Sequence, residues 1–124
     1  MPTPNTWLAS LIKEESSELP VILLGKAFKE NINIDTGSAA YLLLECLGDI
    51  NVEVKEHFDP YIDGADVKDI LAEPACFVLC TKHKIFHDLK FPAGSVVIDV
   101  FRWLPKQPGV RYVRVGIGPS PVNV

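Results

Sequence analysis

The fold is decided by residues 21–48, which read VILLGKAFKENINIDTGSAAYLLLECLG. The four apolar residues before Gly25 are typical of a buried strand in a parallel sheet. A polar loop then leads to residues 39–47, which are apolar nearly all round and predict a well-buried helix. Gly48 is the expected C-terminal cap of that helix. The stretch therefore predicts a strand, a polar loop and a helix in succession.

The same alternation continues along the chain. We expect further strands at residues 51–58, 76–80, 95–99 and 111–115, and further helices at residues 7–16, 66–71 and 82–89. Strands and helices that alternate at this spacing predict a parallel sheet covered on both faces. The expected fold class is α/β, a three-layer Rossmann-like domain with a mainly parallel five-stranded sheet and helices on both faces. Asn5 or Thr6 is the expected cap of the first helix.

The chain divides into three parts on this interpretation. Residues 1–18 form a tail and a helix, residues 19–118 the Rossmann-like domain, and residues 119–124 a loose tail with two prolines. The first helix places apolar side chains at helical spacing on one face, namely Trp7, Leu8, Leu11 and Ile12.

Composition excludes several classes of function. The 124 residues are 48% hydrophobic and 23% charged, with a net charge of -4, which fits a globular domain rather than a disordered chain. A mildly acidic chain offers no electrostatic footprint for nucleic acid. No apolar run approaches the roughly 20 residues that span a bilayer, and the first residues do not resemble a secretory signal. Three cysteines cannot all pair within one chain, so we expect reduced thiols in a cytoplasmic protein.

Ligands of open α/β sheets bind beyond the carboxyl ends of the strands. That rule selects four segments that each follow an apolar strand, at residues 25–29, 58–61, 81–83 and 99–103. In the first, a lysine can neutralise phosphate and Phe28 can stack on a base or sugar, or else pack in the core. In the last, Arg102 can grip phosphate with two parallel bonds, or form a surface ion pair.

A spacing of cysteines and histidines suggests a zinc site that strand geometry does not support. Cys76, Cys80, His83 and His87 spell a zinc-like spacing, but a strand would place the two cysteines about 13 Å apart. Zinc–sulfur bonds are about 2.3 Å, so no metal site is expected there and the cysteines are interpreted as buried structural residues.

No catalytic residue is identified. The acids at positions 59, 63 and 66 are interpreted as a solvated surface. His57, near the end of the second strand, can act as a base but has no partner that the sequence reveals.

Residues 21–47 resemble the opening of the C-terminal domain of the UDP-glucose/GDP-mannose dehydrogenase family, with its strand, G-x-A-F-K turn, polar loop and buried helix. Further segments resemble that domain in the same order, namely HFDPYID (57–63), CFVLCTKHKIF (76–86), SVVIDVFRWLP (95–105) and RYVRVGIG (111–118). The helix at residues 7–16 is similar to the end of the family's linker helix. The resemblance covers nearly the whole chain.

The resemblance implies a domain that binds the UDP part of a UDP-sugar. Phe28 and Lys29 match the family's aromatic–lysine pair, and Arg102 matches its C-terminal arginine. Four further ligand contacts are expected at the strand ends, at Gly25, Lys26, Asp59 and Thr81.

The chain departs from the family at several points. Thr36 stands where many members place an arginine that reaches NAD, and the 124 residues contain neither a GxGxxG turn nor a cysteine in the family's glycine-rich catalytic context. We therefore expect no cofactor bound by this domain alone and no oxidation by this chain alone, with NAD belonging to the complete family enzyme. Expected partners are UDP or a UDP-sugar, a second copy, or a separate NAD-binding half. The alternatives are a non-catalytic interaction module with the same fold, or another Rossmann-like nucleotide-binding domain such as one for coenzyme A.

Overall fold

The computed structural model describes residues 4–25, 39–59, 69–81 and 83–114. Within them, five strands form one sheet in the order β2-β1-β3-β4-β5, and every neighbouring pair is parallel. The strands are β1 (Val21–Leu24), β2 (Val54–Phe58), β3 (Cys76–Leu79), β4 (Val96–Asp99) and β5 (Arg111–Arg114). The helices are α1 (Pro4–Ser16), α2 (Ala39–Asp49) and the short α4 (Lys84–His87).

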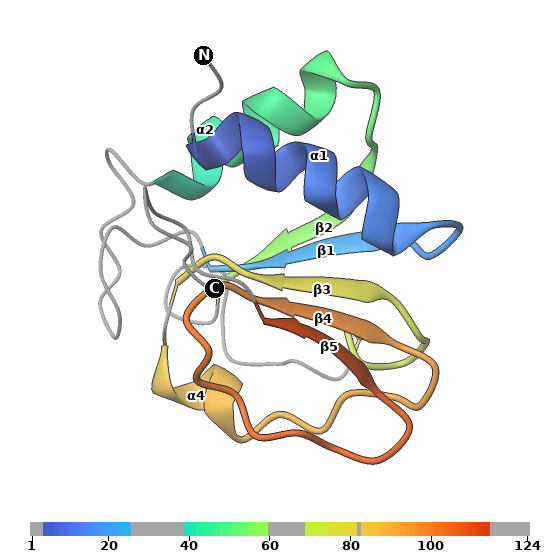
Figure 1. Cartoon of the computed structure of the whole chain (residues 1–124). Coiled ribbons are helices and arrows are strands. Elements are labelled where there is room, and N and C mark those ends of the chain that lie inside the picture. The colour runs from blue at the N-terminus through green and yellow to red at the C-terminus, as the bar shows by residue number, and fades with distance from the viewer. Residues whose placement is uncertain (1–3, 26–38, 60–68, 82, 115–124) are drawn as a thin grey trace.

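The layers are those expected of a Rossmann-like domain. Helices α1 and α2 pack side by side on one face of the sheet, and α4 lies on the other face (Figure 1). The three-layer α/β architecture is therefore confirmed, with a sheet that is parallel throughout.

The three inner strands are buried along their whole length, as their continuous apolar runs predicted. Their side chains alternate between two cores. The core under α1 and α2 includes Ile12, Leu23 and Leu47, and the core on the α4 face includes Leu24, Phe77 and Phe86. The edge strand β2 reads VKEHF and is buried fully only at its last residue, because one of its sides has no neighbouring strand.

Several expected boundaries were wrong. Asn5 and Thr6 do not cap α1, because the helix already begins at Pro4. Gly48 lies inside α2, which continues to Asp49. Strand β2 begins at Val54 instead of Asn51. Of the helix expected at residues 66–71, residues 69–71 form a turn and the others lie outside the described residues.

The apolar helices are less completely covered than the sequence suggested. In α2, Leu43 and Leu47 are buried, but Leu42 is 55% exposed. In α1, Leu8 and Ile12 are buried and Trp7 is 43% exposed. Each helix therefore buries one face against the sheet and its neighbour, while these two side chains remain in contact with solvent.

The chain reverses its winding direction between β1 and β3. The connection from β1 to β2 contains α2 on one face, and the connection from β3 to β4 contains α4 on the opposite face (Figure 1). The neighbouring strands β1 and β3 therefore flank the topological switch point, and their carboxyl ends mark where sheets of this kind bind ligands.

Two glycine substitutions test the packing at this point. Gly25 has a φ of 115°, and a Cβ there would lie 2.5 Å from the Cβ of Thr81 and 2.6 Å from its backbone nitrogen. Gly25→Ala should lower the free energy of unfolding by about 2–5 kcal/mol, because backbone strain adds to the overlap. Gly48→Ala is the control, since that position is helical with no atom within 4 Å, and it should raise stability by about 0.5 kcal/mol. Urea unfolding measures both, and a loss below 1 kcal/mol for Gly25→Ala would contradict the close approach.

Candidate functional site

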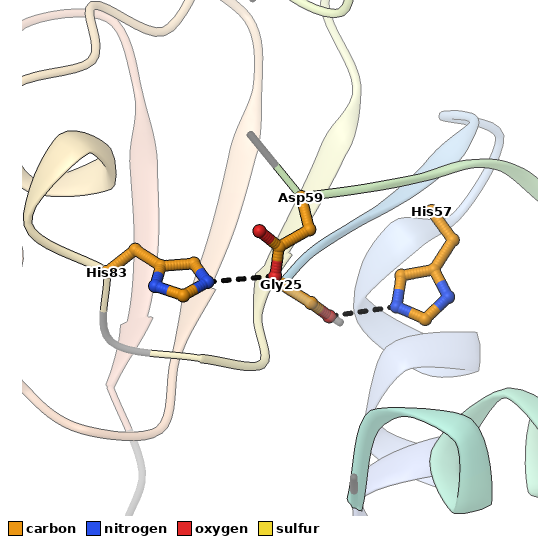
Figure 2. A network of polar contacts seen from close by, with 4 residues as sticks. All are labelled: Gly25, His57, Asp59 and His83. Atoms are coloured by element: carbon orange, nitrogen blue, oxygen red, sulfur yellow. Dashed lines mark hydrogen bonds and ion pairs between the residues drawn. The ribbon is translucent and has the colours of Figure 1, made fainter. Parts of the chain in front are cut away.

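The carboxyl end of β1 is tied to both neighbouring strands. The N–H of Gly25 donates to the carbonyl of Phe58 at 2.7 Å, and the Nε2 of His57 donates to the carbonyl of Gly25 at 2.8 Å (Figure 2). On the other side, the carbonyl of Leu24 accepts the N–H groups of Cys80 at 2.8 Å and Thr81 at 3.2 Å. The ends of β1, β2 and β3 therefore form one hydrogen-bonded edge.

A buried acid–base pair closes this edge. The Nε2 of His83 donates to the Oδ2 of Asp59 at 2.8 Å, and both side chains are fully buried (Figure 2). The centroids of the His83 and Phe86 rings lie 5.5 Å apart, at the start of α4. Asp59 follows β2 and His83 follows β3, so the pair joins the chain segments that leave two different strands. The interpretation of Asp59 as part of a solvated surface was wrong, because its partner, 24 residues later, makes burial possible.

The two histidines of this network differ in their access to a substrate. His83 has no solvent exposure, so in this arrangement it cannot reach a substrate. The Nε2 of His57 carries its hydrogen, since the carbonyl of Gly25 can only accept a bond. In the neutral ring the Nδ1 of His57 keeps its lone pair, and the residue is half-buried, so its action as a base stays a prediction. Both histidines also help to fix the backbone around the switch point.

A second buried acid shapes the end of β4. The Oδ1 of Asp99 accepts the N–H of Phe101 at 3.0 Å, and its Oδ2 accepts the N–H groups of Trp103 and Leu104 at 2.7 Å each. Asp99 is fully buried, whereas Phe101 is 45% exposed and Arg102 is exposed. The turn after β4 thus presents an aromatic ring and a guanidinium at the carboxyl edge. The sequence identified Arg102 but not the role of Asp99.

The expected site residues fall into two groups. Gly25, Asp59 and Thr81 come together at the switch point, and Arg102 lies beyond the end of β4, the strand next to β3. Lys26, Phe28 and Lys29 lie outside the described residues. Asp59 and Thr81 are buried, and the Asp59 carboxylate is bonded within the protein. Contact of any of these residues with a ligand stays a prediction.

The zinc-like cysteines and histidines do not converge. Cys76 is buried in β3 on the α1–α2 side of the sheet, whereas His83 bonds Asp59 and the His87 ring lies 4.9 Å from that of Trp103. Within the described part of the chain, no group of three His, Cys, Asp or Glu side chains could hold a metal ion. The argument against zinc placed Cys76 and Cys80 on one strand, and β3 contains Cys76 but ends at Leu79, one residue before Cys80.

Comparison with known proteins places the fold. No family model matches the chain, and no curated protein does. Among solved structures, the chain is similar to UDP-D-ManNAc dehydrogenase from Pyrococcus horikoshii, with a TM-score of 0.64 and 22% sequence identity over 90% of this chain. The chain spans 30% of the length of that structure. At this identity the likeness shows a shared fold. Among the described helices, none is long and apolar enough to cross a membrane.

Breaking the buried pair should destabilise the domain strongly. Asp59→Ala leaves His83 without its carboxylate partner in a buried position, which should lower the free energy of unfolding by about 3–5 kcal/mol. Asp88→Ala is the control, because it removes an exposed contact to His87 at 3.3 Å and should change stability by about 0.5 kcal/mol or less. Urea unfolding of both variants checks the contrast, and equal losses would contradict a structural role for the buried pair.

The cysteines should differ in reactivity. Burial raises the pKa of the Cys76 thiol to about 12. Burial also raises the pKa of the Cys80 thiol to about 12, although a hydrogen bond with the Leu24 backbone acts to lower it. The thiolate is the reactive form, so at pH 8 these two thiols are protonated and inert. Cys46 on α2 and Cys80 are both partly exposed, whereas Cys76 is buried, so the raised pKa and not access distinguishes Cys80 from Cys46. Mass spectrometry after treatment with iodoacetamide at pH 8 should show modification of Cys46 first, and all three cysteines should react in denaturant. Rapid modification of Cys80 in the folded protein would contradict the raised pKa.

Proposed function

We propose that this domain binds the UDP part of a UDP-sugar, in the manner of the C-terminal domain of UDP-glucose 6-dehydrogenase-like proteins. The observation that carries the proposal is the exposed Arg102 at the carboxyl end of β4, one strand from the switch point. An arginine at this edge can bind the pyrophosphate with two parallel bonds. The fold shared with UDP-D-ManNAc dehydrogenase from Pyrococcus horikoshii supports the proposal.

Three residues make the main contacts in this proposal. Arg102 and Lys29 bind the phosphates and Phe28 stacks on the uracil or the sugar. Lys29 and Phe28 enter on the sequence resemblance. Gly25, Lys26 and Thr81 contribute further contacts in this proposal, with Gly25 allowing the close approach of Thr81 that shapes the edge. Asp59 is fully buried, so it acts on this edge through its bond to His83.

The domain supplies binding and not the redox chemistry. In the complete family enzyme NAD is the hydride acceptor, and this domain alone holds no cofactor in our proposal. A UDP-sugar dehydrogenase activity would then involve another polypeptide segment that binds NAD. A second copy of the chain is a further proposed partner, for association and not for NAD binding. The proposed setting is the cytoplasm, where nucleotide sugars enter polysaccharide biosynthesis.

A specific observation favours one alternative. Trp7 on α1 and Leu42 on α2 are 43% and 55% exposed, although both are large apolar side chains. Exposed apolar side chains of this size occur at protein interfaces. A non-catalytic interaction module with the same fold would use these helices and would have no need of the carboxyl edge of the sheet.

A titration separates the two functions. Adding UDP or UDP-glucose to the ¹⁵N-labelled protein should shift the amide signals of Phe28, Lys29 and Arg102, with affinity in the millimolar range. Lys29→Ala should weaken UDP binding about ten- to a hundred-fold, because a charge-assisted bond contributes about 1.5–3 kcal/mol. Arg102→Lys should also weaken binding, since a point charge cannot replace the planar guanidinium.

The control for lost charge is Lys13→Ala. Lys13 bonds the carbonyl of Ile50, which precedes β2, so it lies toward the amino ends of the strands. This variant changes the net charge equally and should leave UDP affinity unchanged. Absence of shifts at several millimolar UDP would refute the proposal and favour the interaction module. With NAD and UDP-glucose added, the 124-residue polypeptide should produce no NADH.

A further inference from the structure

The backbone of Arg102 adopts a left-handed conformation that no helix end explains. Among the described residues, three that are not glycine have positive φ, namely Ser17 at 52°, Asn51 at 62° and Arg102 at 53°. Ser17 directly follows α1 and Asn51 lies two residues beyond α2, where helices commonly end in a left-handed residue. Arg102 follows a strand, so no helix end accounts for its conformation.

A left-handed arginine persists only where its surroundings impose it. The conformation costs roughly 1–2 kcal/mol for an L-residue with a side chain, and strained backbone of this kind clusters at functional sites. Glycine would adopt it without strain. The presence of an arginine, where glycine would cost no strain, points to a use for its side chain.

Asp99 imposes the conformation. Its carboxylate accepts the N–H groups of Phe101, Trp103 and Leu104, and its own carbonyl accepts the N–H of Arg102 at 3.4 Å. The amides on both sides of Arg102 are thus fixed by one buried carboxylate. Charge-assisted hydrogen bonds in a buried position are stronger than hydrogen bonds between neutral groups, so they can offset the backbone strain at Arg102.

The same bonds decide which side chains of the turn face solvent. Val100 is 8% exposed and Leu104 is 1% exposed, so both ends of the turn are anchored in the core. Between these anchors Phe101 and Arg102 are exposed, an aromatic ring beside a guanidinium at the carboxyl edge. A nucleotide offers the matching chemistry, namely a flat base and an anionic pyrophosphate.

We propose that Asp99 is a positioning residue for nucleotide binding, which holds Arg102 in a left-handed conformation so that Arg102 binds the phosphates and the neighbouring Phe101 contacts the base or sugar. Asp99 itself touches no ligand. The inference rests on the proposed function and adds to it the strained turn and the second aromatic contact.

The test is a double-mutant cycle with UDP as the probe. Arg102→Gly removes the guanidinium and the strain together, so the thermal midpoint should stay the same or rise while UDP affinity falls about ten-fold or more. Asp99→Asn replaces one carboxylate oxygen by an NH₂ group that cannot accept a bond, so it should also weaken UDP binding about ten-fold. In the Arg102→Gly background, Asp99→Asn should weaken binding by clearly less than the ten-fold it costs the wild type, because the part that acts through Arg102 is already lost. Phe101→Ala should weaken UDP binding about three- to ten-fold with little change in the thermal midpoint.

A measurement without ligand keeps the test decisive if Asp99→Asn does not fold. In the wild type, the amide protons of Phe101, Trp103 and Leu104 should resonate downfield and exchange slowly, as protons bonded to a buried carboxylate do. Fast exchange of all three amides would overturn the positioning role, and so would a lower thermal midpoint for Arg102→Gly.

The outcomes separate this inference from the proposed function. Failure of the wild type to bind UDP at several millimolar overturns the proposed function and the ligand contacts of the turn together. A second outcome is that the wild type binds UDP and that Asp99→Asn and Arg102→Gly lower UDP affinity by fully additive amounts. That outcome overturns the positioning role alone. Unchanged UDP affinity in Phe101→Ala overturns the aromatic contact.

Discussion

The site depends on one steric constraint, the approach of the carboxyl ends of β1 and β3. Gly25 lies so close to Thr81 that any side chain at position 25 would overlap the Thr81 backbone. The approach lets the carbonyl of Leu24 accept two N–H groups from the residues after β3. On the β2 side, His57 donates to the carbonyl of Gly25. Three strand ends are thereby held in fixed relation at the switch point, where open α/β sheets commonly bind ligands.

The buried pair of Asp59 and His83 extends this order into the connections. Burial of an acid and a base is a weak source of stability, because desolvation offsets much of their attraction. Its consequence is geometric, since the pair fixes the residue after β2 against the residue two positions beyond Thr81. Register of this kind is the best-attested use of buried polar pairs. Asp59 and His83 therefore determine where the backbone leaves two strands, and so the shape of the edge that a ligand would meet.

The sequence predicted what depends on local pattern and missed what depends on distant partners. Continuous apolar runs identified β1, β3 and β4, because strands with neighbours on both sides and layers on both faces exclude polar residues. Gly48 misled, because the left-handed residue that ends α2 is Asn51, whose N–H donates to the carbonyl of Gly48 at 3.1 Å. The burial of Asp59 was invisible, since it requires His83 far along the chain. Position 102 carries neither glycine nor asparagine, so no local signal indicated its left-handed backbone.

The distribution of charge at the carboxyl edge favours binding over catalysis. Asp59 and Asp99 are fully buried, and their oxygens accept bonds from His83 and from backbone amides. Carboxylates in this position shape the backbone and have no access to a substrate proton. Arg102 is exposed, and a guanidinium does not release its proton at any physiological pH. Asp59 and Asp99 are thus bonded within the protein, while Arg102 faces solvent. This arrangement suits the recognition of an anion. Because Asp59 and Asp99 are bonded to His83 and to the turn, the same bonds that fix the fold leave the guanidinium of Arg102 and the ring of Phe101 exposed, which is what the proposed nucleotide site requires.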